Sequence, residues 1–426
     1  MGRVTTLAGT ARVPAGVSRR FLAPATFVIL GLVDILVFGG YAHHGDAVFA
    51  FSQPFAKVTV PNLRLPAAGT AYALGAASLA IAALRAATDL GKVARRVSIG
   101  LVLAFFVIAL LCWAYAGSAN TFNVVNQLQG TLADSIPLIL GALAGCMCER
   151  SGVINIAIEG QLLLGAFAAA IVASAFGILW LGLIFGSLAG GLVGALLGVF
   201  AITYLVDQII MGVVLNVFVS GLTGFLYDRV MVPYANTLNS PSTYLPIKVP
   251  LLGDIPIIGP VFFDSTLFLY ITYIAIAAVQ VGLFQTRWGL RVRAVGEHPT
   301  AADTVGISVL ATRYRNVILG GLLAGIGGAY LTIGSVGSFG KDMSSGKGYI
   351  ALAAMIFGRW TPLGGVGAAL LFGFAFELQS ILSTVNVPVP SDFLLMTPYV
   401  ATIIAVAGLV GRVRPPAADG KPYVKA

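Results

Sequence analysis

The chain has 426 residues, of which 58% are hydrophobic and only 10% are charged, and its formal net charge is +9. Its mean hydropathy is +0.94. A soluble protein of this length carries about 25% charged residues. The shortage of charge extends along the whole sequence, so the composition excludes a soluble protein and predicts a polytopic membrane protein.

Apolar runs of about 20 residues recur along the chain, and each is long enough to cross a hydrocarbon core about 30 Å thick. We predict an all-α membrane protein with about 10 to 12 membrane segments. The polar stretches 149–160 and 338–350 are expected to interrupt helices, which is unlike an ordinary loop. The segments are predicted near 24–42, 67–87, 98–117, 127–147, 152–175, 178–205, 208–227, 263–285, 315–335, 345–358, 363–383 and 393–411.

Lys and Arg cluster in four hydrophilic segments, and the cytoplasmic loops of membrane proteins carry an excess of these residues. An N-terminus in the cytoplasm places all four segments on the inner side, namely 1–20, 88–97, 286–315 and 412–426. The predicted outer loops then hold only Lys57, Arg64, Arg229 and Lys248. The positive charge therefore indicates a topology with both termini in the cytoplasm, and we expect no nucleic-acid partner.

The sequence divides into three parts. Residues 1–126 are predicted to form an N-terminal extension with about three transmembrane helices. Residues 127–411 hold the membrane core, and residues 412–426 form a cytoplasmic tail. The first 20 residues lack the small-residue cleavage site of a secretory signal, so span 24–42 is expected to remain as an anchor in which Asp34 makes a polar contact.

Glycine recurs at every fourth position of segment 178–205. On a helix this spacing produces one glycine face, which allows a neighbouring helix to approach closely in lipid. The pattern favours helix packing over a substrate-lining groove. The residues concerned are Gly182, Gly186, Gly190, Gly194 and Gly198.

The cysteines and histidines do not predict a metal site. Cys146 and Cys148 are spaced like a metal-binding pair, but no cluster of His or carboxylate residues completes a set of four ligands. We expect these cysteines to be small packing residues, and we assign no metal to the chain.

Charged and polar residues gather in "CERSGVINIAIEGQ", which runs from Cys148 to Gln161 between apolar stretches. Asn155 and Glu159 are four residues apart, which predicts that they share one helical face. Polar groups at membrane depth are costly and mark a transport pathway. The alternative, a structural network that holds a helix break, is equally open for each of them, and Glu149 with Arg150 is expected to be mainly structural.

A weak internal repeat links residues 141–160 with residues 320–360. In both, a glycine-rich helix is followed by a polar interruption and a new helix. Paired broken helices in the two halves of a transporter mark the route through the membrane, because the freed backbone groups must face protein or water. Four aromatic residues near the second break suit either stacking on a base or packing in the core, of which packing is favoured: Phe339, Tyr349, Phe357 and Trp360.

The predicted cytoplasmic segment "RWGLRVRAVGEHPTAADTVGISV" (287–309) contains two short helices, 287–294 and 300–306. Ala301, Ala302, Val305 and Ile307 are too apolar for a free loop, so we expect a partner to cover them. The chain itself lacks an ATP-binding motif. A phosphate-binding loop needs G-x-x-x-x-G-K-[ST], and "SVGSFGKD" (335–342) begins with Ser and ends with Asp.

Three motifs in this order carry a family resemblance: "ERSGVINIAIEGQLLLGAF", "GLRVRAVGEHPTAADTVGISV" and "GYIALAAMIFGRWTPLGGVGAALLFGF". Residues 127–411 resemble the permease subunits of ABC importers for nucleosides and simple sugars, which are relatives of the branched-chain amino acid and ribose permeases. The form of the first motif is closer to the nucleoside branch. The resemblance implies a type II importer fold with broken helices in two pseudo-repeated halves.

The same resemblance implies partners and a location. We expect a cytoplasmic ABC ATPase that binds ATP and Mg²⁺, whereas this chain binds no cofactor. We also expect a second, non-identical permease in a heterodimer, an extracytoplasmic lipoprotein that binds the substrate, and a place in the bacterial plasma membrane.

The resemblance and the polar motifs together assign roles to individual residues. The substrate pathway is expected to include Asn155, Glu159, Gln161, Phe339 and Tyr349. Coupling to the ATPase is expected within 287–314, at Gly296, Glu297, Ala301, Ala302 and Gly306. The helix break is expected to depend on Glu149, Arg150, Gly152 and Lys347.

The leading functional hypothesis is therefore a transport subunit, not an enzyme, in an ATP-driven importer of nucleosides. A simple-sugar permease of the ribose type is the nearest alternative. An ion-coupled secondary transporter is a more distant one, since broken helices and buried carboxylates also occur there.

Overall fold

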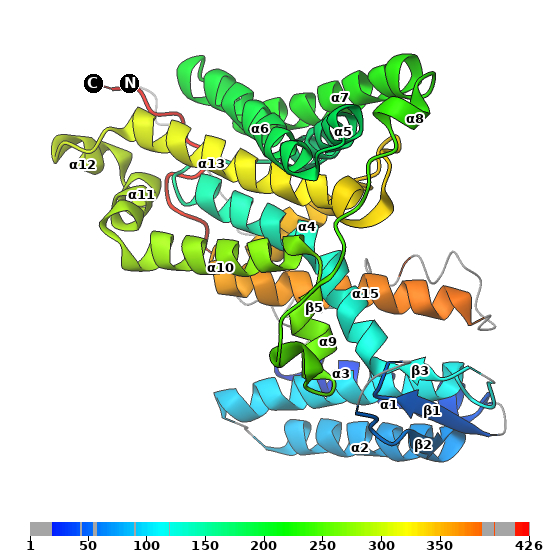
Figure 1. Ribbon diagram of the computed structural model, residues 1–426. Coiled ribbons are helices and arrows are strands. Elements are labelled where there is room, and N and C mark those ends of the chain that lie inside the picture. Colours follow the sequence, from blue (N-terminus) through cyan, green and yellow to red (C-terminus); the bar gives the residue numbers. More distant parts are fainter. Residues whose placement is uncertain are drawn as a thin grey trace, which may run out of the picture. The chain divides into compact units, whose positions relative to one another are not determined.

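The computed structural model describes residues 19–42, 45–53, 58–88, 91–118, 120–385, 396 and 414–425 (Figure 1). They fall into two compact units, one formed by residues up to Val124 with Val385 and the other by Val125–Thr384 with the C-terminal tail. Apart from residue 396, the predicted segment 393–411 lies outside the described residues.

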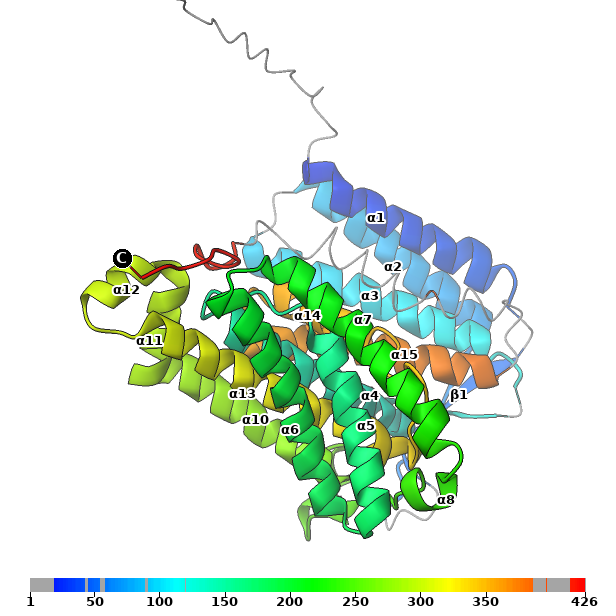
Figure 2. The ribbon, with the colours of Figure 1, turned by 90° about the horizontal axis from the view of Figure 1, so that it is seen from above.

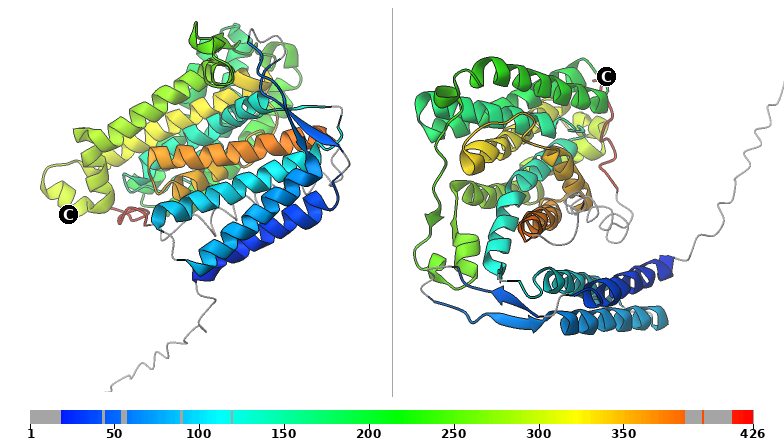
Figure 3. Two further views of the ribbon diagram at one scale, coloured as in Figure 1. Left: turned by 90° about the horizontal axis from the view of Figure 1, so that it is seen from below. Right: turned by 90° about the vertical axis from the view of Figure 1, so that its right-hand side faces the viewer.

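The N-terminal unit contains three helices that pack side by side (Figure 3). They are α1 (Arg19–Val33), which continues as the π-helix η1 (Asp34–Gly39), α2 (Ala67–Ala87) and α3 (Lys92–Ala114). Asp34 is fully buried where η1 meets Gly75 of α2, and its carboxylate has no hydrogen-bond partner among the described residues. The polar contact expected for Asp34 is therefore absent from this part of the structure.

A small sheet accompanies these helices and was not predicted. Strands β1 (Asp46–Ala50), β2 (Leu63–Pro66) and β3 (Phe122–Asn123) lie in the order β2-β1-β3. β1 pairs antiparallel with β2 and parallel with β3, so Val48 lies opposite Arg64 and Phe49 opposite Phe122. The strands were missed because they are short and because β1, with the sequence DAVFA, does not alternate between apolar and polar residues.

The core unit begins with two helices joined by a polar interruption. α4 (Val124–Glu149) is buried along its whole second half, from Ser135 to Glu149. The chain then runs without regular helix to α5 (Ile158–Phe176). The predicted segment 152–175 therefore begins six residues too early, because Gly152 takes a left-handed conformation (φ +85°) that turns the chain out of the helix.

Three further long helices follow, with a folded segment between the last two. They are α6 (Leu179–Gly198, continued by η2, Val199–Thr203), α7 (Gln208–Leu226, continued by η3, Tyr227–Met231) and α10 (Leu267–Gln285). The segment between α7 and α10 holds α8 (Ala235–Leu238), η4 (Leu252–Asp254), α9 (Ile258–Phe263) and an antiparallel pair, β4 (Ile247–Lys248) and β5 (Asp264–Ser265).

The remaining helices complete the core unit (Figure 2). α11 (Arg287–Glu297) and α12 (Pro299–Thr304) are the two short helices expected in the hydrophilic segment. α13 (Val309–Ala329) continues as η5 (Tyr330–Val336), and α14 (Lys347–Phe357) and α15 (Pro362–Thr384) follow. Tail residues 414–425 form no helix or strand.

The regular glycines of α6 lie against α5 and α13. A side chain at Gly190 would collide with the backbone of Gly321 and Gly325 on α13, and one at Gly186 would meet Gly165 on α5. The three helices thereby approach one another through backbone atoms, as expected where small residues allow close packing in lipid. Gly182 and Gly194 likewise face backbone atoms, of Ala169 on α5 and Val317 on α13, whereas Gly198 faces the ring of Tyr314 on α13.

Nine helices in the described part of the chain are long and apolar enough to cross a membrane. Two shorter apolar helices accompany them, Ala23–Gly39 and Lys347–Phe357. α14 has 11 residues. At 1.5 Å per residue it spans about half of a hydrocarbon core, so α14 is too short to cross a membrane by itself.

Candidate functional site

The N-terminal end of α14 is held by Glu159, the second residue of α5. One carboxylate oxygen of Glu159 accepts hydrogen bonds from Ser344 Oγ (2.6 Å) and from the backbone N–H of Gly346 (2.8 Å). The other accepts the backbone N–H of Gly348 at 2.6 Å. A carboxylate at this place satisfies free N–H groups of the helix and complements the positive end of its dipole.

The opposite end of α14 is held by the end of α4. Glu149 accepts a hydrogen bond from the indole N–H of Trp360, and Arg150 donates to the carbonyls of Trp360 (2.8 Å) and Arg359 (3.3 Å). The two glutamates of "CERSGVINIAIEGQ" therefore bind the two ends of one short helix. This arrangement explains why an apolar chain keeps both carboxylates within a few residues.

Asn216 of α7 joins the two broken regions. Its side-chain oxygen accepts the N–H of Gly160 (2.8 Å), and its amide nitrogen donates to the carbonyl of Ile156 (2.9 Å) and to the hydroxyl of Tyr349 (3.1 Å). The amide is almost entirely buried, with 6% of the residue exposed. Asn216 thus ties the start of α5 to the start of α14.

A pocket of about 470 Å³ opens beside this junction. Its polar wall combines an amide, a phenol, hydroxyls and carboxylates, and its apolar wall includes Leu163 and Val217. Such a surface offers both donors and acceptors, together with an aromatic face, to a small polar molecule. The polar lining residues are Glu159, Asn216, Ser220, Asp342, Ser344 and Tyr349.

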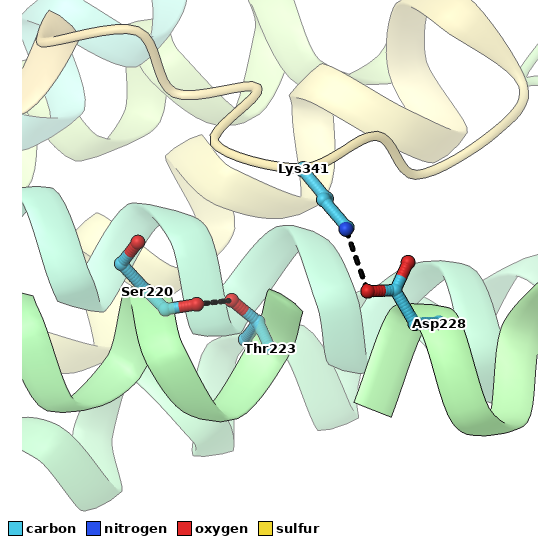
Figure 4. Close-up of polar contacts among 4 residues, drawn as sticks. All are labelled: Ser220, Thr223, Asp228 and Lys341. Atoms are coloured by element: carbon cyan, nitrogen blue, oxygen red, sulfur yellow. Dashed lines mark hydrogen bonds and ion pairs between the residues drawn. The ribbon is translucent and has the colours of Figure 1, made fainter. Parts of the chain in front are cut away.

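Contacts from α7 and η3 hold the polar segment that precedes α14. Ser220 donates to Asp342 at 2.6 Å. Lys341 forms an ion pair with Asp228 at 2.6 Å (Figure 4). The same figure shows Ser220 and Thr223 on α7, where the Thr223 hydroxyl contacts the carbonyl of Ser220. The Ser220–Asp342 and Lys341–Asp228 pairs are both solvent-exposed, so each contributes little to the stability of the fold by itself.

A second, larger cleft of about 880 Å³ lies between α11, the segment after α12 and the first turns of α13. Its lining includes Arg287, Arg291 and Arg315. Leu290 and Val305 also line it and are 62% and 75% exposed. An apolar surface rimmed by positive charge is typical of an interaction site.

The surface around this cleft connects to the helix break through α11. Gly296 is buried directly against the backbone of Arg150 and Gly152, where no side chain would fit. Burial lowers the pKa of the Arg150 guanidinium, although the side chain keeps its charge. A shift of α11 would therefore act directly on the stretch that holds α14.

Comparison with known proteins identifies the family. Residues 127–411 match the branched-chain amino acid transport system / permease component family. The chain belongs to this permease family. No solved structure matches the chain.

Individual permeases are similar over most of their length. The guanosine ABC transporter permease protein NupQ of Bacillus subtilis is 41% identical over 307 residues, which cover 70% of this chain and 96% of NupQ. The nucleoside ABC transporter permease protein NupC of Lactococcus lactis is 41% identical over 318 residues, covering 71% of this chain and 99% of NupC. The putative glucose ABC transporter permease protein TsgC13 of Haloferax volcanii is 33% identical, over 59% of this chain and 76% of TsgC13.

The same two bacteria each hold a second, more distant match. These are the guanosine ABC transporter permease protein NupP of Bacillus subtilis, at 26% identity, and the nucleoside ABC transporter permease protein NupB of Lactococcus lactis, at 24%.

Of the residues assigned to a pathway in this permease, Glu159 and Tyr349 line the 470 Å³ pocket. Asn155 and Gln161 are fully buried and bond to each other, with Asn155 Nδ2 donating to Gln161 Oε1 at 3.1 Å. Phe339 is packed among Phe167 and other core rings. The expectation that Asn155 and Glu159 share a helical face is wrong, because the helix begins only at Ile158.

The residues assigned to coupling separate into two groups. Ala301 and Gly306 are exposed, whereas Gly296 and Ala302 are buried. Glu297 accepts a hydrogen bond from the backbone of the tail, at Ala417 N.

Among the residues assigned to the helix break, Lys347 places its ammonium group over the ring of Phe376, 5.6 Å from the ring centre.

The sequence analysis missed Asn216, whose side chain bonds to both broken regions. A signal was present, since Asn216 is an amide within the apolar run of α7 and such residues mark functional positions at membrane depth. Ser344 and Asp342 had no comparable signal, because they lie in a polar stretch where many residues are equally suited.

Proposed function

We propose that this permease is the membrane subunit of an ATP-driven ABC importer that takes up nucleosides. The observation that carries the proposal is the pocket at the junction of α5, α7 and α14, in a chain whose relatives NupQ and NupC are named for guanosine and nucleoside transport.

The chemistry of the pocket suits a nucleoside. Ribose hydroxyls and base edges are donors and acceptors, and the pocket offers both through Glu159, Asn216 and Ser220. A carboxylate has about four acceptor sites, and three of those on Glu159 are already used by α14. One site remains for a substrate hydroxyl. Tyr349, 46% exposed, supplies a face on which a base stacks.

The pocket favours passage over tight binding. Its polar groups are mostly engaged with one another, so a substrate exchanges hydrogen bonds with them and gains little net energy. In the proposed system an extracytoplasmic lipoprotein supplies the affinity and delivers the nucleoside to the outer side.

The driving force comes from a separate ABC ATPase that carries ATP and Mg²⁺. We place its docking surface on the cleft beside α11, with Leu290, Val305 and Gly306 in contact, and on the exposed side of α12 at Ala301. ATP-driven movement of this surface passes through Gly296 to the backbone of Arg150 and Gly152, and so to α14. This assignment requires both termini of the chain to be cytoplasmic.

The functional permease is proposed to be a heterodimer in the bacterial plasma membrane. The support is that Bacillus subtilis and Lactococcus lactis each hold two unlike permeases that match this chain. Purification of a tagged copy from its host is expected to bring down a second, unlike permease. Recovery of this permease alone with an ATPase would indicate a homodimer.

A simple-sugar permease is the second candidate, favoured by the similarity to TsgC13. Uptake of radiolabelled guanosine, uridine, ribose and glucose in a strain that lacks the chain separates the two. We expect the strain to lose nucleoside uptake and to regain it with the wild-type chain. Loss of sugar uptake with nucleoside uptake intact would overturn the proposal.

A further inference from the structure

The C-terminal tail is bound to α11 through its backbone. The N–H of Ala418 donates to the carbonyl of Gly296 at 2.9 Å, and the N–H of Ala417 donates to the carboxylate of Glu297 at 3.2 Å. The tail therefore uses two residues at the end of α11 that were assigned to ATPase coupling.

The next tail residues contact the helix break. The carbonyl of Ala418 lies beside Gly152, and Gly420 packs against the side chain of Ile154. The carboxyl of Asp419 faces that of Glu149 at the end of α4. The tail thus lies between α11 and the stretch that joins α4 to α5.

α13 supplies the third attachment. Arg313 is 1% exposed and donates to the carbonyl of Lys421 at 3.0 Å, and its charge lies near Asp419. Removing one partner of a buried charge is costly because the charge is left without compensation. Arg313 therefore opposes release of the tail.

Tyr423 closes the tail with an apolar contact. Tyr423 is 7% exposed and packs with Val295 of α11, Ala302 of α12 and Val309 of α13. Part of the apolar side of α12 is consequently covered by the chain's own tail, and the outer side of α12, with Ala301, stays exposed.

We infer that residues 416–423 form a strap that positions the helix break against α11 and α12 and passes the movement of these helices to α14. The inference rests on the proposed function, in which α11 and α12 receive the movement of an ATPase. Without the strap, the contact of Gly296 with the backbone of Arg150 and Gly152 would have to carry the movement alone.

The test uses the reconstituted complex of both permeases with the ATPase and the binding protein. One variant ends after Pro415 and lacks the strap. A matched control ends after Tyr423 and lacks only the last three residues, of which Val424 is 69% exposed. Tyr423→Ala is a milder variant in case the shortest chain fails to assemble.

We expect the strap-less complex to hydrolyse ATP but to take up about tenfold less nucleoside per ATP, since coupling between sites is typically worth a factor of about 5–150. Tyr423→Ala is expected to show a smaller loss, and the control none. Unchanged uptake per ATP, with only the yield or the melting temperature lowered, would show that the tail merely stabilises the fold and would overturn the inference.

Hydrogen exchange tests the strap without any substrate. In the full chain, binding of the ATPase is expected to change exchange at residues 150–157, and in the strap-less or Tyr423→Ala chain this change is expected to be lost. A change of equal size in the variants would overturn the inference. Absence of nucleoside uptake by the wild-type complex would instead reject the proposed function, and the exchange experiment would still decide on the strap.

Discussion

Glu149 and Glu159 perform the same structural task at opposite ends of α14, but their surroundings differ. Glu149 is buried, 3% exposed, against Trp360 and the tail, whereas Glu159 also lines a pocket. A carboxylate enclosed by protein has only a structural part to play, and one that faces a cavity is also available to a substrate. The comparison therefore assigns Glu149 a structural role and leaves Glu159 as the residue of this motif that the proposed pathway requires.

The largest effect is expected from a substitution that forces α14 away from the start of α5. A side chain at Gly348 would collide with the backbone of Glu159, so Gly348→Val must push α14 away from α5. Overpacking of this kind costs about 1–3 kcal/mol or more. We expect little folded protein in the membrane, measured as the yield of soluble protein after extraction with detergent. The control is Gly367→Val on α15, which has open space around it and is expected to behave as wild type.

Replacing each of the two glutamates by glutamine in turn distinguishes the role of Glu159 from that of Glu149. Glu159→Gln is expected to assemble and to keep ATPase stimulation by the binding protein, while uptake falls by about tenfold or more, because a hydrogen bond to a charged group contributes about 1.5–3 kcal/mol. Glu149→Gln retains an oxygen for Trp360 and is expected to transport normally. Normal uptake by Glu159→Gln would make that residue purely structural as well.

A smaller effect is expected at Tyr349. Tyr349→Phe removes the hydroxyl that bonds to Asn216 but keeps the aromatic face, so uptake is expected to fall by less than about threefold, the cost of roughly 0.5 kcal/mol for a partly exposed hydrogen bond. Tyr349→Ala also removes the face and is expected to raise the KM for uptake further. Equal kinetics for the two variants would argue against base stacking.

The smallest effect concerns the pH dependence of the tail. Burial raises the pKa of Asp419 from 3.8 to about 7, with Glu149 and Arg313 as its charged neighbours. Since the folded-state pKa is raised, the stability contribution is fully present below pH 3.8 and is lost as the pH rises through about 7. Exchange protection of residues 416–423 is therefore expected to decrease as the pH rises from about 4 to about 7, and to stay low above that pH.

Asp419→Asn is expected to abolish this decrease, because an amide does not titrate. The same loss of protection in wild type and in Asp419→Asn would show that another group is responsible.

Much of the fold followed from the sequence, because the hydrophobic runs are long and the helix breaks carry charge. Segments 67–87 and 208–227, for example, agree with α2 and α7 at nearly every residue. The spacing of apolar residues did not reveal where α5 begins, because the left-handed Gly152 and a non-helical stretch precede the helix.

The site was harder to predict than the fold. Glu159 was found because a carboxylate in an apolar run is conspicuous. Its partners Ser344, Gly346 and Gly348 lie about 190 residues away in the chain. The sequence does not reveal that a serine hydroxyl and two backbone N–H groups there bind a carboxylate. The docking of the tail was likewise invisible, because its contacts are mostly made by backbone atoms.

The central claim is that nucleosides pass through the pocket beside Glu159, and thiol labelling tests it most directly. The three native cysteines are buried, so Ser220→Cys in the pocket and Asn236→Cys on the exposed α8 each provide one reactive thiol. During ATP-driven turnover of the assembled importer, saturating guanosine is predicted to slow labelling at position 220 but not at position 236. Equal labelling of position 220 with and without the nucleoside would contradict the account.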